Sequence, residues 1–150
     1  MTKPSCLLVM TVLGLSTLGL PQSLSAADKK VVVVPGKAPS PNFSAGIWVG
    51  DTLYVAGQTG NDPKGGGVPE DFEAEVKQAL DNVGAVLKAG GVDFSHVVAV
   101  TVFMTDMDLF QKMNGVYTSV FQEPRPTRTT VGVAKLVGKS RIEITVLARK

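Results

Sequence analysis

Two charged residues near the end of the chain have the chemistry to hold and process a small acid. Arg128 follows Pro126 and opens a β-branched run, so its side chain is expected at the start of a strand. A planar guanidinium matches two N–H donors to the two oxygens of a carboxylate, which fixes orientation as well as charge. Residue type alone favours a surface arginine, since most arginines are exposed.

Glu143 is the candidate for acid–base chemistry. It stands between Ile142 and Ile144, and strand alternation sends its carboxylate to the opposite side from these two apolar side chains. A carboxylate held there can order a water molecule and carry a proton. The same alternation also fits a solvated glutamate without a catalytic part.

Other catalytic and metal-binding patterns are missing from the sequence. The one cysteine, Cys6, precedes an N-terminal apolar run, so the mature chain is expected to hold no disulfide, zinc–cysteine site or cysteine nucleophile. The one histidine, His96, has no partners for a triad, and we expect it at the surface or a strand edge. The glycines at 65–67 lack the Lys-Ser/Thr ending of a phosphate loop.

The elements that position these residues follow from hydrophobic period and turn residues. An amphipathic helix is predicted from Asp71 to Gly90, with Glu75 among the charged residues of its outer face, and a second helix from about Met107 to Phe121. Strands are predicted at 31–34, 45–49, 52–56, 97–104, 129–133 and 141–147. The order βββαβαββ predicts an α+β fold, a mixed sheet with two helices on one face.

The second sheet face has nothing in so small a chain to cover it. Apolar positions such as Val98, Val100 and Val102 are assigned to this face. An apolar face of this kind is expected to be buried against other copies of the chain.

Residues 1–27 have the composition of a secretory signal peptide. The apolar run from Leu7 to Leu20 is shorter than the roughly 20 residues that span a bilayer, and Pro21 closes it, which argues against a membrane anchor. We expect cleavage near Ala27, leaving residues 28–150 as one periplasmic or secreted domain with no membrane contact. The net charge of +2 and the scattered basic residues give no reason to expect nucleic acid as a partner.

Five motifs, in order, resemble signatures of the RidA/YjgF family, and the similarity runs from about Ala38 to Ala148. They are Gly50-Asp51-Thr52-Leu53-Tyr54-Val55-Ala56-Gly57-Gln58, Val102-Phe103-Met104-Thr105-Asp106, Asn114-Gly115-Val116-Tyr117, Pro126-Thr127-Arg128-Thr129-Thr130-Val131-Gly132-Val133 and Ile142-Glu143-Ile144. The resemblance implies a chorismate-mutase-like fold, a homotrimer with sites between subunits, and no metal or organic cofactor. It also implies hydrolytic deamination of small 2-imino and enamine acids, such as 2-aminoacrylate, to 2-keto acids and ammonia.

The resemblance assigns roles residue by residue. Arg128 matches the family's carboxylate-binding arginine, and Glu143 matches its acid near the attacking water. Gly57 and Thr130 match positions whose backbone borders the substrate, and Asn114 matches a polar residue near the site, although an asparagine within a helix can also serve locally.

The chain departs from the family pattern at several of these places. The usual Gly-Pro-Tyr segment reads Pro41-Asn42-Phe43, so Phe43 brings no hydroxyl to the cleft, and Ala56 replaces a serine. Thr130 stands where many relatives have cysteine, and Thr145 where a second acid is common. Lost hydroxyls can change the rate or the choice of substrate.

Three functions are therefore compared. The first is the deaminase, with Arg128 as carboxylate clamp and Glu143 as acid/base. The second is a non-catalytic protein that binds small carboxylates, such as keto acids, in the same cleft. The third, the ribonuclease activity attached to the family's name, fits poorly with export, with a near-neutral charge and with a single histidine.

Overall fold

The computed structural model describes residues 28–150, and the predicted signal peptide lies outside them. The chain folds in the predicted order βββαβαββ. The strands are β1 (Lys29–Val32), β2 (Gly46–Val49), β3 (Thr52–Thr59), β4 (Val97–Met104), β5 (Thr127–Gly132) and β6 (Ile142–Arg149). The helices are α1 (Phe72–Ala89) and α2 (Phe110–Val120), with the short 3₁₀ turns η1 (Phe94–His96) and η2 (Met107–Leu109).

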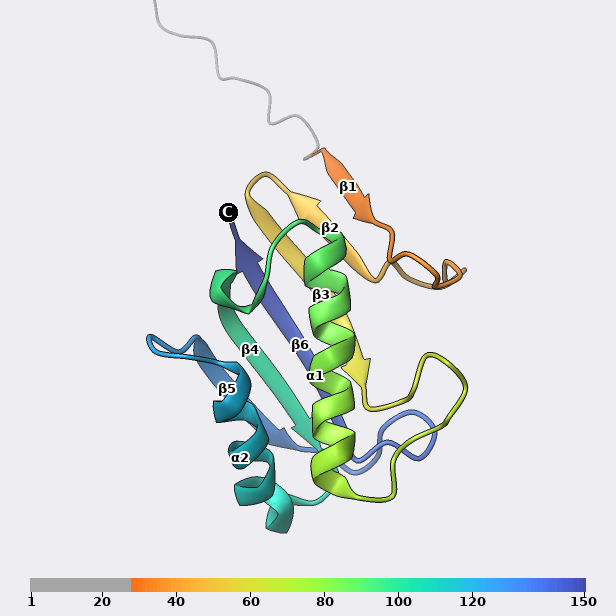
Figure 1. The fold of residues 1–150 in the computed structure, drawn as a ribbon, viewed down its shortest axis with the longest axis vertical. Coiled ribbons are helices and arrows are strands. Elements are labelled where there is room, and N and C mark those ends of the chain that lie inside the picture. The colour runs from red at the N-terminus through yellow and green to blue at the C-terminus, as the bar shows by residue number, and fades with distance from the viewer. Residues whose placement is uncertain (1–27) are drawn as a thin grey trace, which may run out of the picture.

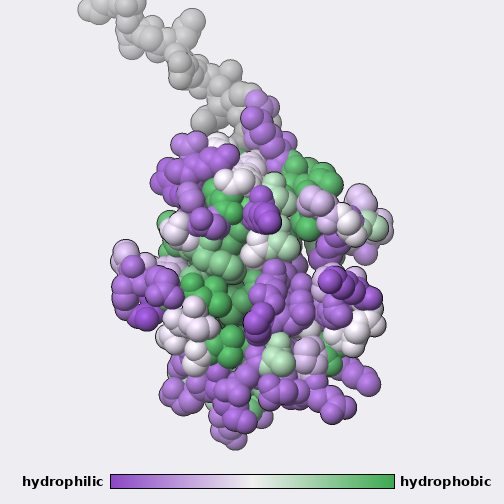
Figure 2. Space-filling view, in the orientation of Figure 1, coloured by the Kyte–Doolittle hydropathy of each residue, from purple (hydrophilic) through white to green (hydrophobic). Residues whose placement is uncertain are grey.

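One six-stranded sheet carries both helices on the same face, which confirms the predicted α+β architecture (Figure 1). Its strand order is β1-β2-β3-β6-β4-β5, and only β4 and β5 run parallel. Figure 2 shows the helix-bearing face, with hydrophilic side chains around its rim and hydrophobic ones gathered between the helices and over β1. No helix within residues 28–150 is long and apolar enough to cross a membrane.

Helix α1 is fixed at both ends and along one side. Asp71 caps its first turn by accepting a hydrogen bond from the Ala74 amide at 2.9 Å, and Gly90 follows its last turn. Leu80, Val83 and Leu87, at helical spacing, are buried. Burial of this apolar stripe against β3 and β6 holds the helix on the sheet.

The predicted place of Glu75 on the outer face of α1 is wrong. Its side chain is fully buried, and Oε2 accepts from Arg141 Nε at 2.7 Å. Oε1 accepts from the backbone amides of Arg141 at 2.6 Å and Ile142 at 3.3 Å. Gly60 gives it room, because a Cβ there would collide with Glu75. The carboxylate thus ties the first turn of α1 to the start of β6.

The predicted faces of β4 need correction as well. Val98 is exposed as expected, but Val100 and Val102 are buried on the helix-bearing face. The pairing of β4 with β6 shifts by one residue between Val97 and Ala99, which reverses the alternation beyond the shift. The open face is therefore lined by Thr101 and Phe103 in place of the two valines.

Replacing Glu75 with alanine should lower the free energy of unfolding by about 3 kcal/mol or more, because Arg141 and two backbone amides would lose their acceptor. Urea denaturation at one protein concentration measures the change. The matched control is Glu73→Ala on the exposed side of the same turn, expected within about 0.5 kcal/mol of the parent. Equal effects of the two substitutions would contradict the role given to Glu75.

Candidate functional site

Arg128 lies on β5 with its side chain turned toward α2. It pairs in register with buried Val100, which places it on the helix-bearing face. Its Cζ lies 4.5 Å from the centroid of the Tyr117 ring and 5.5 Å from that of Phe110. These aromatic faces attract the cation and hold the guanidinium in place. The prediction of a positioned, strand-borne arginine is thus matched by its surroundings.

Within the described residues the Arg128 guanidinium has no acidic partner. None of the ion pairs within residues 28–150 includes Arg128, and its one polar side-chain contact is a distant one, 4.0 Å from Nη1 to Met113 Sδ. A half-buried arginine is ordinarily paired with a carboxylate or fully hydrogen-bonded. Arg128 therefore offers its paired donors to an anion from outside the chain.

Two unpartnered hydroxyls accompany this arginine. In the described part of the chain, the only buried side-chain oxygens without a hydrogen-bond partner are Tyr117 Oη and Thr130 Oγ1. Thr130 lies two residues beyond Arg128 on the same face of β5, and the Tyr117 ring packs under the guanidinium. Unsatisfied buried groups are uncommon, and a pair beside an unpaired cation indicates a ligand site.

A surface hollow of about 320 Å³ opens at Arg128 and Tyr117. It is lined by Asn114, Tyr117, Thr118, Arg125, Pro126 and Arg128. Asn114 lines this hollow together with Arg128, and its Nδ2 donates to Gln111 Oε1 at 3.3 Å. We call Arg128, Thr130, Tyr117 and Asn114 the arginine group.

The electrostatics of the arginine group can be followed at Tyr117. Burial raises the pKa of the Tyr117 phenol above its ordinary value, and the positive charges of Arg128 and Arg125 oppose that rise. The phenol therefore stays protonated at neutral pH and keeps a hydrogen to donate.

Gly57, Phe43 and Glu143 lie together at a second hollow, of about 490 Å³. Gly57 sits in a β-bulge, because the pairing of β3 with β6 shifts register between Val55 and Gln58. A Cβ on Gly57 would lie 2.8 Å from Glu143 Cδ and 3.0 Å from its Cγ. Only glycine at position 57 therefore leaves room for the Glu143 carboxylate. We call Gly57, Phe43 and Glu143 the glutamate group.

Side chains complete the bulge. Gln58, which is buried, donates from Nε2 to the carbonyls of Ala56 at 2.9 Å and Gly57 at 3.2 Å. Thr145 donates from Oγ1 to the Val55 carbonyl at 2.6 Å. The carbonyls that the register shift takes out of the ladder are thereby satisfied, which fixes the backbone next to Glu143.

Within one chain the two groups lie apart. Phe103 pairs with Glu143 on one side and with Val131 on the other, so Glu143 is level with a residue three positions beyond Arg128. Strand geometry puts the two positions about 10 Å apart along the strands and about 10 Å across them. Alternation also places Glu143 on the open face and Arg128 on the helix-bearing face.

The remaining candidates lie elsewhere. His96 is half-exposed in η1, where its Nδ1 lies 2.9 Å from Asp93 Oδ1 as part of a capping box. Hydrogen bonds from Ser95, and then from His96, lower the pKa of the Asp93 carboxyl to about 2. Residues 28–150 contain no cluster of three His, Cys, Asp or Glu side chains that could hold a metal ion.

Known proteins resemble this chain in sequence and in fold. The family model described as "Endoribonuclease L-PSP" matches residues 35–150, a range that contains both groups. The 2-iminobutanoate/2-iminopropanoate deaminase of Mus musculus is 41% identical over 128 residues, covering 83% of this chain and 94% of that protein. The chain belongs to the RidA/YjgF family.

Solved structures agree with the family assignment. The Rid-family protein YyfA from Yersinia pestis is 29% identical with a TM-score of 0.78, covering 82% of this chain and 100% of that one. TdcF of E. coli, solved with bound serine, is 30% identical with a TM-score of 0.74, covering 81% and 98%. The chorismate-mutase-like fold expected of a RidA/YjgF protein is therefore confirmed.

Sequence reasoning missed Tyr117 as a member of the site. In the sequence, Tyr117 is an apolar position of the second predicted helix and part of a RidA/YjgF motif. An aromatic residue at helical spacing is most simply explained as part of the core. The missed signal was its hydroxyl, since a tyrosine on a buried helix face needs a hydrogen-bond partner.

Removing the charge of Arg128 should raise the pKa of Tyr117 further, because the cation that stabilises the phenolate is lost. A spectrophotometric titration of Arg128→Ala in a Tyr54→Phe background isolates this phenol, since the chain has two tyrosines. Lys112→Ala, an exposed position on α2, should leave the titration in place. A downward shift in Arg128→Ala would contradict the placement of the guanidinium.

Proposed function

We propose that this protein hydrolyses small 2-imino acids to 2-keto acids and ammonia, without a metal or organic cofactor. The observation that carries the proposal is the unpaired, half-buried guanidinium of Arg128, held on two aromatic rings beside two unpartnered hydroxyls. The names of its relatives point to the same chemistry, since several are 2-iminobutanoate/2-iminopropanoate deaminases at about 40% identity.

In the proposed reaction Arg128 binds the substrate carboxylate through its two paired N–H donors. This contact fixes the orientation of the carbon–nitrogen double bond. Glu143 accepts a proton from a water molecule as its oxygen attacks the imine carbon. The same carboxyl returns the proton to nitrogen, and the carbon–nitrogen bond then breaks. As the carbonyl forms, Glu143 takes the hydroxyl proton and passes it to the departing ammonia, which leaves as ammonium. Atoms balance, because one water and one iminium give one keto group and one ammonium ion.

The site we propose is formed by two subunits of a homotrimer. One subunit supplies the arginine group and its neighbour supplies the glutamate group, since the two lie on opposite faces of one sheet. The open face provides a surface for the contact, where Tyr54 is 50% exposed and Val131 is 40% exposed. Apolar side chains of this size on an uncovered sheet are stabilised by association.

A non-catalytic keto acid binder is the alternative that a specific observation favours. Phe43 is 61% exposed at the hollow that holds Glu143, and it brings no hydroxyl where relatives have tyrosine. The arginine group would still bind a carboxylate in such a protein. Ribonuclease activity has less support, because His96 is engaged in its capping box with Asp93 and lines neither hollow.

We also propose that the domain acts outside the cytoplasm, with residues 1–27 as a cleaved signal peptide. Its substrates would then be imines that arise there, for example from exported oxidases. The absence of cysteine after Cys6 fits a protein that works in an oxidising compartment without thiol chemistry.

Arg128→Ala should lower kcat/KM for 2-iminobutanoate by about a hundredfold or more, and Arg128→Lys by less, because lysine keeps the charge but not the paired donors. The imine is generated in situ by an amino acid oxidase, and its loss is followed with and without the purified protein. If the parent protein binds pyruvate but leaves the rate of imine loss unchanged, the protein is the non-catalytic keto acid binder and the proposed deaminase function is wrong.

Gly57→Ala should lower kcat by at least about tenfold, because the added methyl takes the space of the Glu143 carboxylate. Glu143→Gln, which keeps the shape and removes the base, should lower it by about a hundredfold. Gly115→Ala is the control, since a Cβ there meets nothing within 4 Å. A Gly57→Ala variant with parental kcat would contradict the role of the bulge.

A further inference from the structure

The hollow of the glutamate group extends beyond Gly57 and Glu143 along one edge of β3. Strand β2 begins at Gly46, opposite Val55, so beyond Ala56 this side of β3 has no neighbouring strand within residues 28–150. A cavity of about 490 Å³ occupies this place, enclosed by the loops that precede β2, α1 and β6. Asn82 of α1 fixes one wall by donating to the carbonyls of Thr59 and Asn61, both at 2.9 Å.

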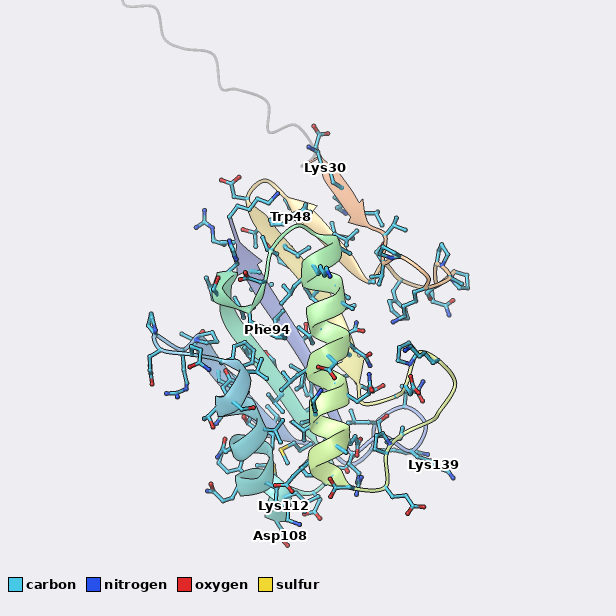
Figure 3. The ribbon with its side chains drawn as sticks, in the orientation of Figure 1. Lys30, Trp48, Phe94, Asp108, Lys112 and Lys139 are labelled. Atoms are coloured by element: carbon cyan, nitrogen blue, oxygen red, sulfur yellow. The ribbon has the colours of Figure 1, made fainter. Side chains whose placement is uncertain are left out.

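Two lysines from different loops line this cavity. Lys37 comes from the loop after β1, and Lys139 from the loop before β6, where Figure 3 shows its side chain at the edge of the molecule. Neither forms an ion pair with a described residue. Glu143 is the only acid on the wall, so the cavity beyond it is positively charged.

Gly57 and Glu143 belong to the wall of this cavity, so the cavity adjoins the place where the proposed mechanism puts the imine carbon. Exposed Phe43 offers an apolar surface for methylene groups, and Lys37 and Lys139 belong to the same wall. Ammonium groups on flexible stems attract a carboxylate without demanding one geometry, so side chains of more than one length can be accepted. The wall therefore favours an acidic side chain over a short apolar one.

We propose that the preferred substrates are 2-imino dicarboxylates, such as 2-iminoglutarate and iminosuccinate, with the distal carboxylate bound by Lys37 and Lys139. This inference rests on the proposed deaminase function and specifies its substrate class. Arg128 holds the first carboxylate as before. Water adds to the imine carbon, the carbon–nitrogen bond breaks, and 2-oxoglutarate or oxaloacetate is released with ammonium.

The test compares an acidic and a neutral imine on the same protein. A D-aspartate oxidase generates 2-iminoglutarate from D-glutamate, and an amino acid oxidase generates 2-iminobutanoate. The parent should show a kcat/KM at least about tenfold higher for the acidic imine than for 2-iminobutanoate. In the Lys37→Met, Lys139→Met double variant, kcat/KM for the acidic imine should fall by about tenfold. Its kcat/KM for 2-iminobutanoate should change by less than about twofold. Lys135→Met, exposed on the same loop as Lys139 but outside the cavity wall, is the matched control and should behave as the parent.

Binding of the products gives a second readout that does not depend on turnover. The parent should be stabilised against heat by 2-oxoglutarate at lower concentration than by 2-oxobutanoate, and the double variant should lose this difference. Turnover of 2-iminobutanoate without preference for the acidic imine would overturn this inference and leave the deaminase intact. If neither imine is turned over and neither keto acid binds, the proposed function and this inference both fail.

Discussion

Strand alternation places the two chemically important side chains on opposite faces of one sheet, and the rest of the functional account depends on that constraint. Arg128 shares its face with the buried valines of β4, while Glu143 shares the open face with Phe103. No rotation of either side chain brings them to one small molecule, because a layer of backbone lies between them. The mechanism we propose therefore requires a second copy of the chain to supply one of the two groups.

Each group is supported by contacts that leave its reactive atoms available. Tyr117 and Phe110 hold the guanidinium of Arg128 without consuming its hydrogen-bond donors. On the other face, the bulge at Gly57 makes room for Glu143, and Gln58 and Thr145 satisfy the carbonyls that the bulge displaces. The buried carboxylate of Glu75 fixes Arg141, two residues before Glu143. Rigid support around open polar groups is what binding a small polar substrate requires.

Local patterns in the sequence were enough for the order of elements and for much of the site. The strands predicted at 45–49 and 52–56 and the helix predicted from Asp71 depend on neighbouring residues alone. The face of Glu143, between two isoleucines, needs only alternation. The faces of Val100 and Val102 could not be predicted, because a one-residue shift against β6 reverses the alternation of β4. The burial of Glu75 depends on Arg141, 66 positions away, and a charged residue on a helix gives no sign of such a partner.

Subunit complementation tests the central claim most directly. Arg128→Ala and Glu143→Gln chains, each expected to retain about a hundredth of the parent activity alone, would be unfolded together in equal amounts, refolded, and assayed with 2-iminobutanoate. In a randomly assembled mixture, about a quarter of the sites combine the intact Arg128 of a Glu143→Gln subunit with the intact Glu143 of an Arg128→Ala neighbour. The mixture should therefore recover about a quarter of the parent activity. A mixture that assembles with parental size but shows no more activity than its separate components would contradict a site shared between chains.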